Sequence, residues 1–177
     1  MLRATTVIDH CHGPDARITL DETMRHRRRV MLTTDRDGNG ANFSFLLDLP
    51  ETRLIRHGEG LVLDDGRVVE VIAAPEPLYE VHGANARHLL ALAWQIGNRH
   101  LSCEIRGNRL MIRRDAVIRN MLEGLGARVV EIEASFTPEG GAYGRGGGHS
   151  HDHGHGHSHE HDHYHGHSHD HGHDHGH

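Results

Sequence analysis

The chain has 177 residues, with 19 arginines, no lysine, 25 acidic residues and 22 histidines, and its formal net charge is −6. Fifteen histidines occupy every odd position from His149 to His177, so the end of the chain differs in composition from the rest. Residues 1–144 carry 18 arginines and 20 acidic residues, and this near neutrality argues against general nucleic-acid binding. No apolar run is long enough to span a membrane, and we expect a cytoplasmic protein.

The two cysteines, Cys11 and Cys103, are too few for a disulfide framework and lack the paired spacing of a zinc ribbon or a redox motif. A reducing compartment fits this pattern. The sequence also shows no Ser/His/Asp order, no phosphate-binding glycine loop and no convincing pair of carboxylates. We therefore do not expect an enzyme.

Residues 1–74 predict a small all-β domain. Short aliphatic runs alternate with turns, and the segment Asp64-Asp65-Gly66-Arg67 is a hairpin signal between two of them. A helix is expected only around residues 21–26. The predicted strands are 16–20, 29–33, 42–47, 60–63 and 68–72.

The run Ala73-Ala74-Pro75-Glu76-Pro77 marks the expected domain boundary, because proline restricts itself and the residue before it to extended conformations. Residues 75–144 then predict two helices, one capped by Asn85 and one capped by Asp115. The first should direct Leu89, Leu90, Ala93 and Ile96 to one side, and the second Val117, Ile118, Met121, Leu122 and Leu125. The predicted strands are 78–81, 101–105, 109–112 and 127–132.

This order of elements, β-α-β-β-α-β, is that of the ferredoxin-like sandwich, so the expected fold class is α+β. Each of the two domains has about 70 residues, a size at which one hydrophobic core gives marginal stability and oligomerisation often compensates. A homodimer is therefore expected.

Residues 145–177 form a His-rich tail that contains nothing able to build a core, and we expect it to be disordered without metal. Alternating histidines lie close enough to converge on one cation when the chain bends, and imidazole-rich sites favour nickel, copper and zinc. A purification tag is the alternative, but tags are usually consecutive histidines. The candidate metal ligands of the tail are His149, His151, His153, His155, His157, His159, His161, His163, His165, His167, His169, His171, His173, His175 and His177.

The motif Gly97-Asn98-Arg99-His100 follows the first predicted helix of the second domain. Without further context, an isolated histidine at such a place is usually a surface residue and not a ligand. Other motifs accompany it, and the stretch 85–143 is the most specific. They are Asp65-Gly66-Arg67-Val68-Val69-Glu70-Val71, Ala73-Ala74-Pro75-Glu76, Arg113-Arg114-Asp115 to Met121-Leu122, and Phe136-Pro138-Glu139-Gly141-Ala142-Tyr143 before the tail.

Together these residues resemble the urease accessory proteins of the UreE type, which are nickel metallochaperones. The resemblance implies an N-terminal β domain, a ferredoxin-like C-terminal domain that joins a homodimer, and a nickel site built from His100 of both subunits. It further implies capture of Ni(II) and its delivery to urease apoprotein, with the accessory GTPase UreG as partner. Zn(II) or Cu(II) would also bind in vitro. The alternative is a His-rich protein for metal storage or detoxification, in which the tail is the whole function.

One departure from the resembled pattern concerns two further histidines that some members carry at the start of the second helix. Here the matching positions are Arg114 and Ala116, so we expect those secondary sites to be missing. Other candidates are weaker, and each has a simpler interpretation. His10-Cys11-His12 would be the end of a surface strand, and Asp35-x-Asp37-x-Asn39-Gly40 would be a turn, because it lacks the glutamate of a calcium loop. The run Arg25 to Arg29 would be a solvated face. His82 and His88 would be surface or interface residues, and Cys103 would be a core residue.

Overall fold

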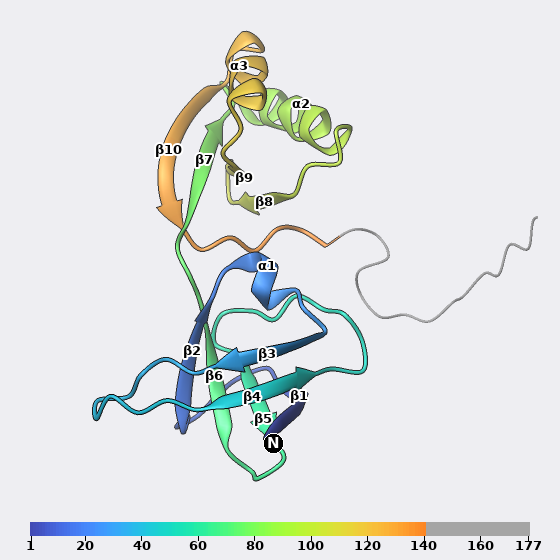
Figure 1. Ribbon diagram of the computed structural model, residues 1–177. Coiled ribbons are helices and arrows are strands. Elements are labelled where there is room, and N and C mark those ends of the chain that lie inside the picture. The colour runs from blue at the N-terminus through green and yellow to red at the C-terminus, as the bar shows by residue number, and fades with distance from the viewer. Residues whose placement is uncertain (141–177) are drawn as a thin grey trace, which may run out of the picture. The chain divides into compact units, whose positions relative to one another are not determined.

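The computed structural model describes residues 1–140, which form a two-domain architecture with a β-rich N-terminal part and a mixed α/β C-terminal part (Figure 1). The N-terminal part is a six-stranded sheet with the order β2-β6-β5-β1-β4-β3. Its elements are β1 (Arg3–Ile8), β2 (Ala16–Leu20), the short helix α1 (Glu22–Arg25), β3 (Arg29–Thr33), β4 (Ser44–Asp48), β5 (Gly60–Leu63) and β6 (Val68–Ala73).

The five strands predicted for this part are confirmed, with shifts of one or two residues at some ends. The prediction missed β1, although its sequence is rich in the β-branched residues that strands favour. β1 is an interior strand of the sheet, since it pairs in parallel with β4 and antiparallel with β5. The hairpin expected at Asp64 to Arg67 is also confirmed, because β5 and β6 are antiparallel and Gly66 adopts φ +90° at the turn.

The C-terminal part is a four-stranded sheet with the order β10-β7-β9-β8, in which every adjacent pair is antiparallel. Its elements are β7 (Glu76–His82), α2 (Ala86–Gly97), β8 (Cys103–Arg106), β9 (Arg109–Arg113), α3 (Ala116–Gly124) and β10 (Arg128–Ala134). The element order is therefore the predicted β-α-β-β-α-β. Only Ala74 and Pro75 lie between β6 and β7.

The two faces of this second sheet carry different partners. Both helices cover one face, where Leu92, Ile96 and Leu122 pack with alternate residues of β7 and β9 (Figure 1). On the other face Leu78 and Met111 pack against Phe136, which follows β10 and is fully buried. The strand periodicity of two accounts for this division.

Both predicted helix caps are confirmed. The Asn85 side chain accepts from His88 N, and the Asp115 side chain accepts from Val117 N and Ile118 N. The predicted apolar faces are partly wrong, because Leu90, Val117 and Leu125 are 72%, 75% and 44% exposed. None of the helices among residues 1–140 is long and apolar enough to cross a membrane.

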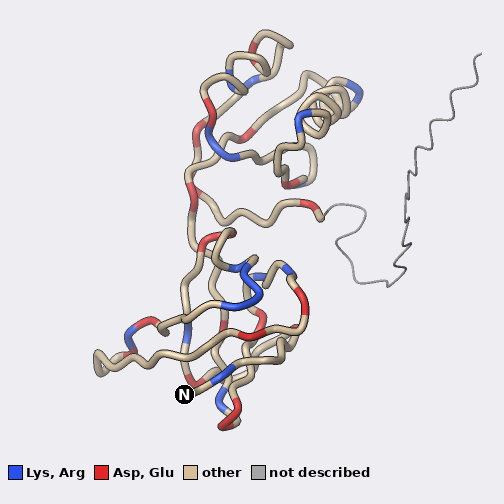
Figure 2. The backbone as a smooth tube through the Cα atoms, turned by 45° about the vertical axis from the view of Figure 1, so that its right-hand side comes forward, with Lys and Arg blue, Asp and Glu red and all other residues tan. Residues whose placement is uncertain are grey.

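The interpretation of Arg25 to Arg29 as a solvated face is wrong at its first residue. The basic stretch follows α1 (blue in Figure 2), and Arg27, Arg28 and Arg29 are exposed, but Arg25 is fully buried. Its guanidinium donates to the carbonyl oxygens of Ile55, at 3.1 Å, and of Phe136. Arg25 therefore joins the N-terminal part to the segment that follows β10.

Carboxylates compensate the buried charge of Arg25. Burial lowers the pKa of its guanidinium, and the carboxylates of Glu76, Glu22, Asp21 and Glu104 oppose that shift. Glu22 also pairs with Arg113 of β9 at 2.6 Å, and the backbone N–H of Glu22 donates to Glu76. The contact between the two parts is thus a network of alternating charges.

We predict that Arg25→Met lowers the free energy of unfolding by roughly 3 kcal/mol, because two buried carbonyl groups lose their donor. Urea denaturation measures this change. Arg27→Met is the matched control, since Arg27 is exposed and its loss should change stability by less than about 0.5 kcal/mol. Equal effects of the two substitutions would contradict the role assigned to Arg25.

Candidate metal centre

His100 lies immediately beyond the C-terminal end of α2, where the backbone closes the helix through two hydrogen bonds. His100 N donates to Gly97 O at 2.9 Å, and Leu101 N donates to Ile96 O at 3.4 Å. These two bonds define a Schellman motif, in which the residue at the position of His100 adopts a left-handed conformation. Ile96 and Leu101 belong to the same hydrophobic cluster, as this motif usually requires.

His100 has φ 56°, and it is the one non-glycine residue with positive φ among residues 1–140. Glycine usually occupies this position, since a Cβ atom in the left-handed region clashes with the backbone at a cost of about 1 kcal/mol. The sequence thus places an imidazole where a glycine would stabilise the helix end better. Such local strain often marks a functional residue.

The His100 side chain is exposed, and α2 leads to it with an apolar stripe that faces solvent in the single chain. Leu90 and Trp94 are one helical turn apart and are 72% and 64% exposed. Ile105 of β8 is 54% exposed and lines a common groove with Leu90. We call Leu90, Trp94 and Ile105 the apolar patch, because exposed apolar side chains that lie on neighbouring elements often mark an interaction surface.

Cys103 lies three residues after His100 and is half-buried against the core, as predicted. Burial, together with Glu139 and Glu104, raises the pKa of its thiol to about 11. The thiol is therefore protonated at neutral pH, whereas metal ions bind the thiolate. Cys103 is a poor ligand in this state.

The structure does not gather the donors of His10-Cys11-His12 into a metal site. These residues lie in the irregular connection between β1 and β2, with both histidines exposed. Burial and the carboxylates of Glu70 and Asp15 raise the pKa of the Cys11 thiol, which disfavours the thiolate. Within residues 1–140, no three His, Cys, Asp or Glu side chains are close enough to hold one metal ion.

His82 and His88 have structural partners. His82 Nε2 lies 2.7 Å from Glu80 Oε1. His88 Nδ1 accepts from Ala84 N, and its Nε2 lies 3.0 Å from Leu125 O, so its ring links the start of α2 to the end of α3. The sequence predicted surface or interface residues here, and both histidines are half-buried with hydrogen-bond partners in their own chain.

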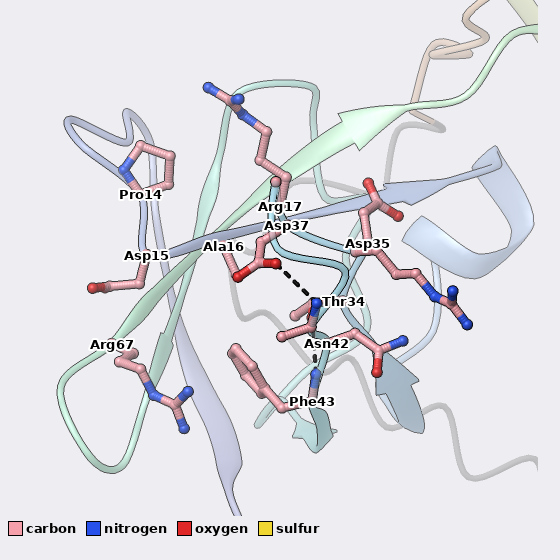
Figure 3. Close-up of a pocket in the computed structure, with 13 residues that line it drawn as sticks. Pro14, Asp15, Ala16, Arg17, Thr34, Asp35, Asp37, Asn42, Phe43 and Arg67 are labelled. Carbon is pink, nitrogen blue, oxygen red and sulfur yellow. Dashed lines mark hydrogen bonds between the residues drawn. The ribbon is translucent and has the colours of Figure 1, made fainter.

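A cavity of about 540 Å³ lies in the N-terminal part and includes the predicted turn at Asp35 to Gly40 (Figure 3). Its aspartates already accept hydrogen bonds: Asp15 from Val68 N, Asp35 from Thr19, and Asp37 from the N–H groups of Asn39 and Ala41. Asp37 thus caps its own turn, which confirms the turn interpretation. Arg67 stacks on the Phe43 ring at 4.0 Å, and no set of free carboxylates converges in the cavity.

Arg114 and Ala116 occupy the two positions at which some UreE-type sequences carry further histidines; Arg114 has a structural role, and Ala116 begins α3. Arg114 donates to the carbonyl oxygens of Leu78 and Ile132 and pairs with Glu131 and Glu133. The fifteen candidate ligands His149 to His177 lie outside the described residues.

Comparisons with known proteins agree with the two-part architecture. Residues 2–74 match the model of the UreE urease accessory protein N-terminal domain, and residues 76–165 match that of the C-terminal domain. The chain belongs to the UreE urease accessory protein family. The C-terminal match includes both His100 and part of the tail.

Relatives named urease accessory protein UreE support this assignment. One from Chelativorans sp. (strain BNC1) is 64% identical over 143 residues, which cover 81% of this chain and 87% of the relative. One from Rhodopseudomonas palustris (strain HaA2) is 50% identical over 146 residues, covering 81% and 66%. One from Bradyrhizobium sp. (strain BTAi1 / ATCC BAA-1182) is 51% identical over 146 residues, covering 81% and 68%. The UreE resemblance predicted from the sequence is therefore confirmed.

The left-handed backbone of His100 gives a prediction that separates strain from metal binding. We predict that, in metal-free buffer, the free energy of unfolding of His100→Gly is about 1 kcal/mol higher than that of His100→Ala. The reason is that only glycine relieves the strain of the left-handed backbone. Chemical denaturation of the two variants measures this difference. If the alanine variant were the more stable, His100 would not occupy a strained position.

Proposed function

We propose that this chain captures Ni(II) and delivers it to urease apoprotein during assembly of the urease active site. The observation that carries the proposal is the exposed His100, which occupies a strained glycine position in the most specific motif of a UreE chain. An imidazole at a position where glycine would be more stable points to a role other than stabilising the fold. Imidazole is a suitable ligand for nickel, and the chain belongs to a family of urease accessory proteins. Together these two facts favour nickel binding.

A single chain does not supply enough donors near His100, since no group of three donors occurs within residues 1–140. A two-fold axis would present His100 twice and thereby provide two nitrogens for one ion. The apolar patch supports this arrangement, because a second copy of the chain would cover Leu90 and Trp94 of α2, the helix that precedes His100, together with Ile105 of β8. We therefore propose a homodimer with a nickel site at its axis.

Such a site is open, and openness suits delivery. Two imidazoles leave coordination positions for solvent or for histidines of the tail, whereas four protein ligands would retain the ion as in a structural site. The tail, with candidate ligands His149 to His177, would add capacity for Ni(II), and Zn(II) or Cu(II) would bind the same groups in vitro. The protein would act as a non-catalytic accessory factor in the cytoplasm, with the GTPase UreG and urease apoprotein as partners.

The alternative function is metal storage or detoxification, and the fifteen alternating histidines of the tail favour it. The two functions differ in what the body does without the tail. A delivery protein lacking residues 145–177 should retain about one tight nickel ion per dimer, whereas a storage protein should lose tight binding altogether. Calorimetric nickel titration of the intact chain and of the chain lacking residues 145–177 therefore distinguishes the two functions.

The nickel site is tested with two tail-less proteins, one with His100 and one with His100→Ala. We predict tight binding for the first and none for the second, and affinity should fall as the pH decreases because a protonated imidazole cannot bind a metal ion. The fall should approach about two decades per pH unit when both imidazoles of the site are protonated. Calorimetric nickel titration at several pH values measures both effects.

Two outcomes would contradict this assignment. Equal tight binding by both proteins would remove His100 from the site, and affinity independent of pH would indicate carboxylate ligands instead. Circular dichroism of His100→Ala serves as the control for folding.

The homodimer is tested by placing a charge in the apolar patch. We predict that Trp94→Glu weakens self-association at least about tenfold, because a buried carboxylate without a partner is strongly unfavourable. Val117→Glu is the matched control, since Val117 is also exposed but lies on α3 and does not belong to the apolar patch. Light scattering over a concentration series measures the change, and similar effects of both substitutions would contradict this interface.

A further inference from the structure

Arg99, the residue before His100, is fixed against the end of α2. Its Nη1 donates to both the backbone oxygen and the side-chain Oε1 of Gln95, each at 2.9 Å. The backbone N–H of Arg99, which would reach Gln95 O in a continuing helix, donates instead to Ile96 O at 3.1 Å. The guanidinium therefore serves a carbonyl group that the closing of the helix leaves without its usual backbone donor.

The charge of this guanidinium is not balanced by acidic residues in the surrounding sequence. Residues 81–103 contain no aspartate or glutamate, although they include Arg87, Arg99 and the whole of α2. The two oxygens that accept from Arg99 belong to the uncharged Gln95, and the Arg99 side chain is exposed. The end of α2 therefore carries a full positive charge in a fixed position.

The acidic residues of the neighbouring segments have partners of their own. Glu104 of β8 accepts from Arg106 at 2.6 and 3.0 Å, so an arginine compensates its charge. Glu139 accepts from Ile105 N at 3.3 Å. Both carboxylates stay the same when Arg99 is replaced, so their field cancels in a comparison of variants at that position.

The guanidinium of Arg99 lies close enough to His100 for its charge to act on a cation bound there. Gln95 precedes His100 by about 7.5 Å along the helix axis, which places the guanidinium roughly 10 Å from the imidazole. Screening is incomplete at this separation, because the Debye length is about 10 Å at 0.1 M salt. The bond to Gln95 O also offsets part of the negative partial charge at the helix end, which would otherwise favour a cation.

We propose that the fixed positive charge of Arg99 lowers the affinity of His100 for Ni(II) and so makes the ion easier to release. This inference rests on the proposed nickel function. A guanidinium and a divalent cation repel each other, and in the proposed dimer two copies of Arg99 would act on one ion. Arg99 is not a ligand: repulsion raises the free energy of the loaded site without changing the atoms that bind the ion.

The test compares the chain lacking residues 145–177 with Arg99→Gln in the same background. The described hydrophobic clusters lie within residues 1–140, so this truncation keeps the core of both parts. At about 20 mM salt, Arg99→Gln should bind Ni(II) about fivefold more tightly, because two repulsive charges are removed from each dimer. At about 0.5 M salt the Debye length is about 4 Å, and the difference should fall below about 1.5-fold. Calorimetric nickel titration measures both values.

Two control variants separate the position of the charge from other effects of the substitution. Arg87→Gln removes the same charge from the first turn of the same helix, about 18 Å from Arg99 along the axis, and should change nickel affinity by less than about 1.5-fold. Arg99→Lys keeps the charge but alters the hydrogen bonds to Gln95. It should bind nickel within about twofold of the unmodified chain.

Three outcomes would overturn the inference. Unchanged or weaker affinity in Arg99→Gln at low salt would show that the charge does not act on the ion. A gain that persists at high salt, or that Arg99→Lys shares, would indicate an altered helix end instead of a charge effect. An equal gain in Arg87→Gln would indicate the net charge of the protein and not the position of Arg99.

His100→Ala, measured in the same series, distinguishes failure of this inference from failure of the nickel function. If His100→Ala binds as tightly as the unmodified chain, the proposed nickel site itself is wrong. If His100→Ala loses tight binding and Arg99→Gln does not differ from the unmodified chain, only the role of Arg99 is wrong. Arg99→Met removes the same charge with a different side chain, and it replaces Arg99→Gln if circular dichroism shows the latter to be misfolded.

Discussion

The contact between the N-terminal part and the segment after β10 depends on the hydrogen bonds of the buried Arg25 guanidinium. This guanidinium satisfies carbonyl groups from two distant stretches, Ile55 in the N-terminal part and Phe136 after β10. A buried charge is tolerated only when hydrogen bonds and opposite charges surround it, and here Glu22 and Glu76 supply part of that compensation. Those carboxylates also bind Arg113, so the same network holds α1 against β9.

This network also fixes Phe136, close to the end of the described residues. Because Arg25 fixes the carbonyl of Phe136, the ring of Phe136 is held over Leu78 and Met111 on the open face of the second sheet. Arg113 also lies over that ring, at 5.7 Å from its centroid. Burial of an aromatic ring and a charged network therefore stabilise the same short segment, and each would be weaker without the other.

The sequence predicted those features whose cause is local. Asn85 and Asp115 cap helices because their side chains accept from the next turn, and Gly66 permits a tight hairpin, so neighbouring residues suffice for these predictions. β1 was missed although its β-branched run was a usable signal. Arg25 could not be distinguished from Arg27 or Arg29, because its burial depends on carbonyl groups far away in the chain.

The helix faces show a second limit of sequence patterns. Leu90 and Trp94 follow the same helical spacing as the core residues Leu92 and Ile96, yet they face solvent in the single chain. Hydrophobic periodicity predicts that a helix has an apolar face. It does not predict whether that face packs against the chain's own sheet or against another molecule. The motif around His100 predicted the candidate site residue, but the left-handed backbone of His100 follows from the closing bonds of α2 and had no signal in composition.

The strain at His100 has a physical bearing on how an ion would be held and released there. The Schellman bonds fix the backbone on both sides of the residue, so the imidazole projects from a rigid support while its own position remains less stable than glycine would be. Cys103, the nearest sulfur in the sequence, stays protonated because its pKa is raised to about 11, so it does not compete as a strong thiolate ligand. An ion bound through imidazoles alone exchanges more readily than one bound by thiolates, since neutral nitrogen ligands hold it without adding charge. A rigid support with exchangeable ligands would therefore suit the proposed delivery of the ion better than its storage.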